Sequence, residues 1–245
     1  MSTTAPYEVV VIGGGVAGLS AAVFTAHHGL DTLVVDSGES ILRRNAHLEN
    51  FPGFPAGVNG RQLLDLLEAQ GAEAGCEQVT ATVSRIERTE GGFAVETDDE
   101  ARYRSEYGIA ATKNTTDYLT GIDGVGIIDR GKAFVDTDER GRTGVDGLYA
   151  AGRLAEKPHQ AAVCAGHGAE VAVTILEDDD RPFYHDWVAP EGYFTGRGRD
   201  LPPGCEEIGD EERRERETES REVMQAYFEK PYPEDPEQHP SVAED

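Results

Sequence analysis

Cysteine and long apolar runs are scarce in this 245-residue sequence. Its three cysteines are Cys76, Cys164 and Cys205, and no two of them form a CxxC pair. The odd count and the wide spacing exclude a redox dithiol of that type and argue against a disulfide-stabilised scaffold. No stretch reaches the roughly eighteen apolar residues of a membrane span, and the first residues lack a basic segment followed by an apolar one. We therefore expect no transmembrane helix and no signal peptide, and we predict a cytoplasmic protein.

Positive charge is also scarce. The chain carries 47 acidic against 22 basic side chains, a formal net charge of −25, and only four of the basic side chains are lysines. A field of this sign repels nucleic acids and anionic membranes, so neither is expected as a partner. Because salt screens the self-repulsion of such a chain, the composition favours a protein from a high-salt cytoplasm. An acidic protein from an ordinary cell is the alternative.

What the sequence does contain is a complete βαβ unit at its start. An apolar, β-branched run at residues 7–12 has the composition of a buried parallel strand. The glycine turn GGGVAG follows at residues 13–18, then a helical segment at residues 19–28 and a second apolar strand that ends at Asp36. This order is the arrangement of a nucleotide-binding βαβ unit.

The glycines of this turn occupy the positions of a GxGxxG motif. Gly13 permits the tight turn, Gly15 allows the backbone to approach a pyrophosphate, and Gly18 lets the helix pack against the strand. Asp36 can accept both hydroxyls of an adenosine ribose and would repel a 2′-phosphate, so NADP is not expected here. We predict a dinucleotide site, against the alternative of a glycine turn that only packs the helix. The motif alone does not choose between FAD and NAD.

Beyond this unit, the hydrophobic pattern adds a meander to a parallel sheet with helices. Residues 79–95 alternate apolar and polar side chains across a Gly-Gly turn, which assigns Val79, Val83 and Phe93 to an antiparallel meander. Other apolar segments predict elements at residues 60–75, 107–111, 133–135, 147–151 and 160–176. The fold class is therefore α/β, with a Rossmann-like domain that combines a parallel sheet, helices and a three-stranded antiparallel meander.

We place the end of this domain at residue 176, where the composition changes. Residues 177–245 are rich in Glu, Arg and Pro, and residues 210–230 form a strongly charged helix candidate, so we predict an acidic, partly helical extension. Its start holds the aromatic residues Phe183, Tyr184, Trp187, Tyr193 and Phe194. Because such side chains need a covering surface, we expect residues 181–205 to pack against the domain of residues 1–176 or at a dimer interface.

Three further segments resemble the thioredoxin-reductase-like flavoproteins of the pyridine nucleotide-disulfide oxidoreductase superfamily. They are ENFPGFP at residues 49–55, GLYAAG at residues 147–152 and QAA at residues 160–162, and they occur in the order of that family. The resemblance covers residues 7–176 and implies one non-covalently bound FAD. It implies cofactor contacts at Gly13, Gly15, Val16, Ala17, Gly18, Asp36, Ser37, Asn50, Val79, Ala111, Thr112, Gly152, Arg153, Gln160 and Ala161.

The resemblance also distributes these contacts along the cofactor. The glycine turn would hold the pyrophosphate, Asp36 the adenosine ribose, and the backbone of Val79 would lie beside the adenine. Gly152 and Arg153 would flank the ribitol and the phosphates, Asn50 would approach the flavin, and Gln160 and Ala161 would meet its pyrimidine edge. A helix that begins at Gln160 would direct N–H groups at the flavin N1–C2=O region, where negative charge collects on reduction.

The sequence departs from this family in two places. The relatives insert an NADPH domain, with a second glycine motif and the redox CxxC, between the two halves of the FAD domain. Here residues 113–131 form the whole join, too short for a βαβ unit of about thirty residues. The second departure is Arg153, where the relatives have Asp. An arginine can pair with a phosphate but cannot accept a ribitol hydroxyl, so FAD binding is either preserved with altered contacts or weakened.

These features predict an FAD-dependent oxidoreductase that cannot act as a thioredoxin reductase. Its electrons would come from NAD(P)H, from an electron-carrier protein or from a small substrate, and a homodimer is compatible with the sequence. Two alternatives stay open: a non-enzymatic redox sensor or partner subunit that binds FAD or NAD, and a single-domain NAD enzyme. Cys164 is either a thiol near the flavin or a small buried hydrophobe, and His159 is either a flavin hydrogen-bond donor or a loop residue. No catalytic acid or base and no metal site is assigned.

Overall fold

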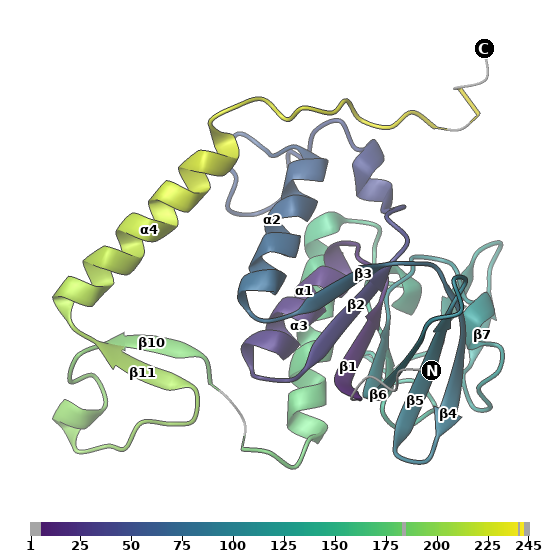
Figure 1. Cartoon of the computed structure of the whole chain (residues 1–245), viewed down its shortest axis with the longest axis horizontal. Coiled ribbons are helices and arrows are strands. Elements are labelled where there is room, and N and C mark those ends of the chain that lie inside the picture. Colours follow the sequence, from purple (N-terminus) through teal and green to yellow (C-terminus); the bar gives the residue numbers. More distant parts are fainter. Residues whose placement is uncertain (1–5, 183–184, 240, 243–245) are drawn as a thin grey trace. The chain divides into compact units, whose positions relative to one another are not determined.

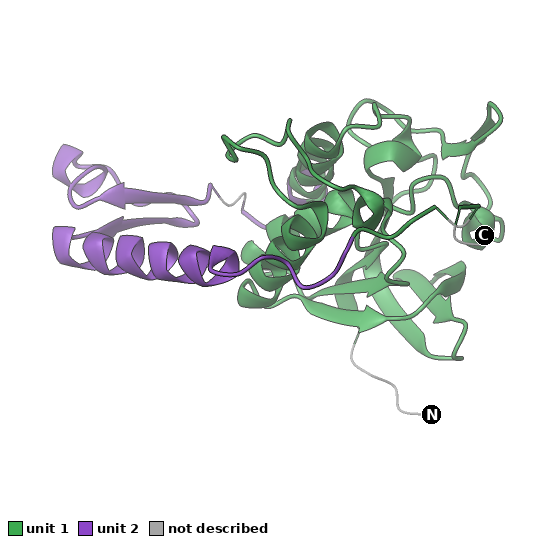
Figure 2. Ribbon diagram, turned by 90° about the horizontal axis from the view of Figure 1, so that it is seen from above, with its two compact units in different colours: residues 1–175, 236–245 green, residues 176–235 purple. Residues whose placement is uncertain are grey.

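The structure, a computed structural model, describes residues 6–182, 185–239 and 241–242. The chain forms two compact units (Figure 2). One consists of residues 1–175 together with residues 236–245, and the other of residues 176–235. The predicted domain boundary at residue 176 stays a prediction, because compactness alone does not show that the two parts fold separately.

The first unit is built on a parallel sheet (Figure 1). Its strands are β3 (Glu77–Thr80), β2 (Thr32–Asp36), β1 (Tyr7–Ile12), β6 (Arg102–Ala110) and β9 (Leu148–Ala150), in that spatial order. Side chains of a strand alternate between the two faces of a sheet. Val10 and Ile12 accordingly enter the larger core cluster, whereas Val11 lies against the glycine turn and α1. The sheet is thus covered on both faces, as the apolar composition of β1 predicts.

The three-stranded antiparallel meander is confirmed. It consists of β4 (Val83–Thr89), β5 (Gly92–Thr97) and the first half of β6, whose second half pairs with β9. The assignment of Val79 to this meander is wrong, because Val79 pairs with Val35 in the parallel edge strand β3. The error has a physical cause: an edge strand with one exposed face shows the same alternation of apolar and polar side chains as a meander strand.

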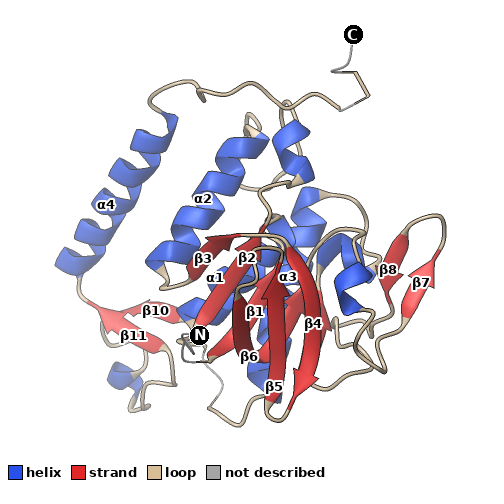
Figure 3. Cartoon of the chain, turned by 45° about the vertical axis from the view of Figure 1, so that its right-hand side comes forward, coloured by secondary structure: helices blue, strands red, loops and turns tan. Residues whose placement is uncertain are grey.

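Three helices cover the face of the sheet opposite the meander core (Figure 3). They are α1 (Val16–His27), α2 (Gly60–Glu73) and α3 (Ala161–Asp178). α1 and α2 share a buried leucine-rich cluster. α3 approaches α1 so closely that a Cβ added to Gly168 would lie 2.0 Å from the carbonyl oxygen of Ala17. The small residues of α3 therefore allow the backbone of one helix to touch the next.

Short elements complete this unit. They are the 3₁₀ turns η1 (Ile41–Arg44), η2 (Asp117–Leu119) and η3 (Gly152–Ala155), and the hairpin of β7 (Ile127–Asp129) and β8 (Ala133–Val135). The turn η2 and strand β7 lie within the join of residues 113–131, and β8 follows it directly. Asn114 closes the join by donating a hydrogen bond to the carbonyl of Ala133 at 3.1 Å.

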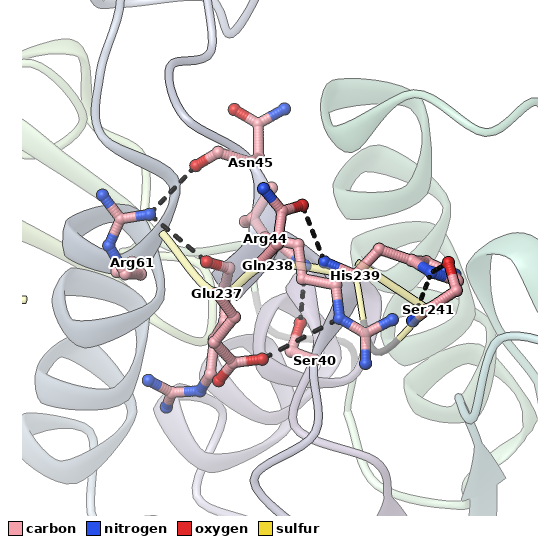
Figure 4. A network of polar contacts seen from close by, with 10 residues as sticks. Ser40, Arg44, Asn45, Arg61, Glu237, Gln238, His239 and Ser241 are labelled. Carbon is pink, nitrogen blue, oxygen red and sulfur yellow. Dashed lines mark hydrogen bonds and ion pairs between the residues drawn. The ribbon is translucent and has the colours of Figure 1, made fainter. Parts of the chain in front are cut away.

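The last described residues return to the first unit at η1 (Figure 4). The backbone N–H of Glu237 donates to the carbonyl oxygen of Arg43 at 3.2 Å, and its carboxylate lies 3.9 Å from Nε of Arg44. The buried guanidinium of Arg61 donates to the same Arg43 carbonyl and to that of Asn45. The final segment of the predicted extension thus packs on the first unit.

The second unit is a small parallel ribbon followed by a helix. Strands β10 (Trp187–Pro190) and β11 (Cys205–Ile208) pair directly, the turn η4 (Thr195–Arg197) lies between them, and α4 (Asp210–Phe228) follows. All residues of α4 lie outside the core, as its charged sequence predicts.

Aromatic side chains form a cluster of their own in this unit. The ring centroids of Tyr193 and Phe194 lie 5.0 Å apart, and Trp187 lies 5.3 Å from Tyr193. The expectation for Phe183 and Tyr184 falls outside the described residues. That residues 181–205 cover a face of the first unit or a dimer interface remains a prediction. Deletion of residues 181–245 should then expose apolar surface or weaken flavin binding, and an unchanged deletion protein that is soluble and fully loaded with flavin would contradict it.

Candidate functional site

The three motif glycines meet different surroundings. Gly13 has a φ of +106°, and an added Cβ would lie 2.9 Å from the carbonyl oxygen of Ala111. A Cβ on Gly18 would lie only 1.9 Å from the carbonyl oxygen of Gly13. At Gly15 the one neighbour within 4 Å is Oγ of Ser40, at 3.7 Å. Gly13 and Gly18 are therefore required by packing, whereas Gly15 borders open space.

This open space lies at the N-terminus of α1. Gly15 is the N-cap residue, no side chain caps the helix there, and its first turn contains no acidic residue. The backbone N–H groups of a first helical turn have no partner within the helix, and the helix dipole makes this end positive. The end of α1 therefore has the properties of a phosphate-binding helix terminus, with Gly15 leaving room for the ligand.

Asp36 links the glycine turn to the end of β2. Its Oδ1 accepts a hydrogen bond from the N–H of Gly14 at 2.7 Å, and its Oδ2 accepts one from the N–H of Gly38 at 3.0 Å. A carboxylate oxygen has two lone pairs, so each one can still accept a ribose hydroxyl. Gly14, which the motif leaves unspecified, is thus part of the site, and an added Cβ would lie 2.8 Å from Cγ of Asp36.

The end of β6 lies beneath the glycine turn. The N–H of Ala111 donates to the carbonyl of Ile12, and the Ala111 carbonyl lies under Gly13. The hydroxyl of Thr112 is within 2.9 Å of the Tyr118 hydroxyl and donates to a backbone carbonyl of the next turn. The carboxyl ends of neighbouring parallel strands therefore meet at one edge, where α/β folds bind their ligands.

Gly152 joins this edge from β9, but its N–H group is already used. Its φ is +64°, and an added Cβ would lie 2.6 Å from Cβ of Ala17. Its N–H donates to Nδ1 of His167 at 3.0 Å. Ala17 is thus enclosed by Gly152 and Gly168, so its expected contact with a pyrophosphate can involve only its backbone N–H.

His167 is a residue of this site that the sequence analysis missed. Burial lowers the pKa of its imidazole to about 4, with a further contribution from the positive charge of Lys157. The neutral ring accepts the Gly152 N–H and fixes η3 against α3. One signal was present: position 167 falls on the same helical face as the buried residues Cys164, Val171 and Ile175.

The two residues expected beside the flavin contact each other. Nδ2 of Asn50 donates to Oε1 of Gln160 at 2.9 Å, although the two are 110 positions apart in the sequence. Ala161 begins α3 next to them and packs, with Val16, against the leucine-rich cluster of α1 and α2. The structure thus brings the ENFPGFP segment and the start of α3 together at one place.

The adenine-side residues lie around the end of β2. Val79 of the neighbouring strand pairs with Val35 and packs against the core, and Ser37 directly follows Asp36 in an exposed turn. Val79 and Ser37 thus belong to the part of the edge formed by β2 and β3. Asn50 and Gln160 come from other segments, the ENFPGFP segment and the residue before α3.

Arg153 makes contacts unlike those of the other expected site residues. Its guanidinium lies 4.7 Å from the centre of the Phe134 ring and donates to the carbonyl oxygen of Lys157 at 3.1 Å. Cation–π contact and hydrogen bond fix the head group toward the β7–β8 hairpin. The expected contact of Arg153 with FAD stays a prediction.

The structure bears on the two residues for which the sequence leaves alternatives open, Cys164 and His159. Cys164 is buried, and burial raises the pKa of its thiol, so its side chain behaves as a small hydrophobe that packs against Gly152. His159 has a lowered pKa, caused by partial burial and by the positive charges of Lys113, Arg153 and Lys132. A neutral imidazole is favoured there.

The described part of the chain contains neither a candidate metal centre nor a membrane-spanning helix. No three His, Cys, Asp or Glu side chains come together there in a way that could hold a metal ion. Within the same residues, no helix is both long and apolar enough to cross a membrane.

Comparisons with known proteins identify similarity in the first βαβ unit and in the fold. Residues 8–46 match the family model described as "FAD binding domain". The chain is 30% identical to a thioredoxin reductase of Dictyostelium discoideum over 41% of this chain and 34% of that protein, and 33% identical to one of Aquifex aeolicus over 43% and 33%. The chain thus matches about a third of the length of these curated relatives.

Solved structures show the same fold. A thioredoxin reductase from Gloeobacter violaceus superposes with a TM-score of 0.66 and 17% identity, across 74% of this chain and 99% of that chain. The enzyme from T. acidophilum superposes with a TM-score of 0.61 and 19% identity, across 71% and 98%. These findings confirm the α/β fold, the resemblance to thioredoxin-reductase-like flavoproteins and FAD as the cofactor of this type of domain.

Proposed function

We propose that this chain is the FAD-carrying part of an oxidoreductase, and that the cofactor lies along the carboxyl edge of β2, β1, β6 and β9. The observation that carries the proposal is the arrangement of the first βαβ unit. Gly15 leaves space in front of an uncapped helix N-terminus, and Asp36 stands at the neighbouring strand end with acceptor capacity to spare. Both features fit a dinucleotide.

The residues of the edge would each contribute a defined contact. The N–H groups at the start of α1 would bind the pyrophosphate, Asp36 would accept the ribose hydroxyls, and Asn50 with Gln160 would hold the flavin ring. Bound FAD would supply reversible transfer of two electrons or a hydride. The chain would orient that group and present backbone donors of α3 to the side of the ring that gains negative charge on reduction.

The redox partners are proposed to differ from those of a thioredoxin reductase. The relatives bear that name, but this chain has neither a CxxC pair nor a second glycine motif after a strand. Within this chain the electrons would therefore have to enter from NAD(P)H or a carrier protein that docks from outside. A cytoplasmic location in a high-salt cell and a homodimer remain part of this proposal.

A visible spectrum and a reduction test examine the proposal. The protein is purified in high salt, supplemented with FAD and freed of excess cofactor. Flavin absorption bands that remain with the protein, and that bleach under anaerobic NADH or NADPH, support the oxidoreductase. Bands that neither donor bleaches favour a carrier-protein donor or a sensing role. A colourless protein that retains no FAD contradicts the proposal.

A further inference from the structure

Positive charge gathers in one place on this acidic chain. An open depression of about 380 Å³ lies between the turn of the β7–β8 hairpin and η3. Its lining consists of Arg130, Gly131, Lys132, Phe134, Arg153 and Glu156. Three cations thus accompany a single carboxylate, in a chain whose acids outnumber its bases by 47 to 22. We call this surface the basic depression.

One cation of the basic depression is held in a fixed orientation. The Arg153 guanidinium is stacked on Phe134 and tied to the Lys157 carbonyl, and within the described residues it has no carboxylate partner. A guanidinium carries five N–H donors in a planar fork, and one contact to a carbonyl leaves most of them free. An immobilised arginine of this kind is well suited to bind the oxygens of a phosphate.

A fourth cation comes from the join. Lys113, next to the Asn114 that is hydrogen-bonded to β8, does not line the basic depression, but its charge interacts with that of the lining residue Lys132. Lys113 has a φ of +62°, a backbone conformation that residues other than glycine rarely adopt. Partial burial and the positive charges of Lys132 and Arg44 lower the pKa of its ammonium group. The backbone thus holds this lysine where other cations already lie.

The local charge is not neutralised by the protein. Arg130 pairs with Glu156 at 3.2 Å, but among the described residues neither Lys113 nor Lys132 has a carboxylate within 4.0 Å. Like charges placed together repel one another, and an anion that binds between them removes this cost. In a protein so rich in acids, cations without carboxylate partners indicate that a negatively charged ligand from outside belongs there.

We propose that the basic depression is a second anion site, separate from the glycine turn, which binds a phosphate group of a small molecule. Concave shape, a stacked arginine and an aromatic wall fit a phosphorylated ligand better than they fit the broad acidic surface of a carrier protein. A nicotinamide dinucleotide with a 2′-phosphate and a free phosphate ester share this chemistry. Asp36 disfavours a 2′-phosphate at the glycine turn, so such a ligand would need a different place on the chain.

Calorimetry on the full chain tests the site, with inorganic pyrophosphate, 2′,5′-ADP, NADPH and NADH as probes. The double variant Arg130→Gln/Lys132→Gln removes two cations of the rim and leaves Arg153 intact. We expect the double variant to bind the phosphate-bearing probes roughly tenfold more weakly, because that is the effect of losing about one charge-assisted hydrogen bond. Affinity should also fall as KCl is raised. Tighter binding of NADPH than of NADH would identify the ligand as a dinucleotide with a 2′-phosphate. Binding of pyrophosphate without binding of either dinucleotide would identify the ligand as a free phosphate ester.

Arg88→Gln is the matched control, because Arg88 is an exposed arginine of β4 that does not line the basic depression. An equal loss in this control contradicts the site, as does unchanged binding in the double variant or the absence of binding of every probe. The titrations are run with and without added FAD. Phosphate binding without FAD binding would contradict the proposed function and leave this inference standing.

Discussion

At the scale of single residues, the motif glycines separate into two groups. Gly13 and Gly18 are in contact with backbone atoms and are needed for the fold, whereas Gly15 borders the space in front of α1. Asp36 has a double role, since it ties down the glycine turn through Gly14 while keeping acceptor capacity for a ligand. A motif that looks uniform in the sequence thus contains structural and ligand-facing positions.

Two alanine variants separate these groups. Gly18→Ala puts a Cβ 1.9 Å from a carbonyl oxygen, so we expect unfolding or a large loss of stability, on the order of 3 kcal/mol. Gly15→Ala meets no close neighbour, and Gly15 has an ordinary φ of −80°, so stability should change by less than about 1 kcal/mol. FAD affinity of this variant should nevertheless fall at least about tenfold, as judged by cofactor titration. Wild-type affinity in Gly15→Ala would contradict this assignment of the turn.

His167 predicts a pH dependence of stability. Burial lowers its folded-state pKa to about 4, below its usual value of 6.5, so its contribution to stability is complete above pH 6.5 and is lost as the pH falls toward 4. The contribution is on the order of 3 kcal/mol. His167→Asn keeps an acceptor for the Gly152 N–H without a titrating ring. Urea unfolding across this range should show a flatter pH profile for the variant, and identical profiles would contradict the prediction.

The sequence predicts some of these residues and not others, for a physical reason. Gly13, Gly18 and Asp36 lie in one local motif, and Asn50 and Gln160 follow from a resemblance that spans distant segments. His167 has no local motif, because its role arises only when α3 docks beside η3 and its ring meets the Gly152 N–H. The helical pattern around position 167 indicates a buried side chain, but it does not indicate which group that side chain contacts.

At the scale of elements, the sequence predicts the helices and most strands, but it does not predict which strands pair with each other. β6 pairs with β5 through residues 102–105, with β1 through residues 105–110 and with β9 through residues 108–110. Hydrophobic periodicity describes which face of a strand is buried, not which neighbour it pairs with. This limit explains why the alternating pattern predicts Val79 in the meander, whereas the residue pairs with Val35 as part of β3.

In the second unit, one carboxylate organises the loop between β10 and β11. Glu207 accepts hydrogen bonds from the N–H groups of Gly192, Phe194 and Thr195 and from the Thr195 hydroxyl, and the hydroxyl contributes most to a pKa lowered to about 2. A lowered pKa means that this stabilisation is present above about pH 4.5 and is lost as the pH falls toward 2.

Trp187, the single tryptophan of the chain, reports on this loop because it packs on Tyr193 and Phe194. In the wild type, protonation of Glu207 below about pH 4.5 should change the tryptophan fluorescence. We expect Glu207→Gln to show the same change already at neutral pH. Glu206→Gln is the control, since that neighbouring carboxylate pairs with Arg216 instead. If both variants behave alike, Glu207 does not hold the loop.

At the scale of the whole molecule, the net charge of −25 opposes the compact state, and the basic depression is a local exception. The range of electrostatic repulsion falls from about 10 Å at 0.1 M salt to about 3 Å at 1 M. We expect the midpoint of thermal unfolding to rise by several degrees over that range of KCl. Sucrose controls for general exclusion from the surface. A midpoint that does not respond to KCl would contradict the high-salt interpretation.

The central claim concerns FAD at the glycine turn, and equilibrium titration of the purified full chain with FAD in high salt tests it most directly. The account predicts saturation at one FAD per chain in the wild type, with binding markedly weakened in Gly15→Ala while that variant unfolds at the same urea concentration as the wild type. No saturable binding of FAD by the folded wild type, or equal affinity in both proteins, would contradict it.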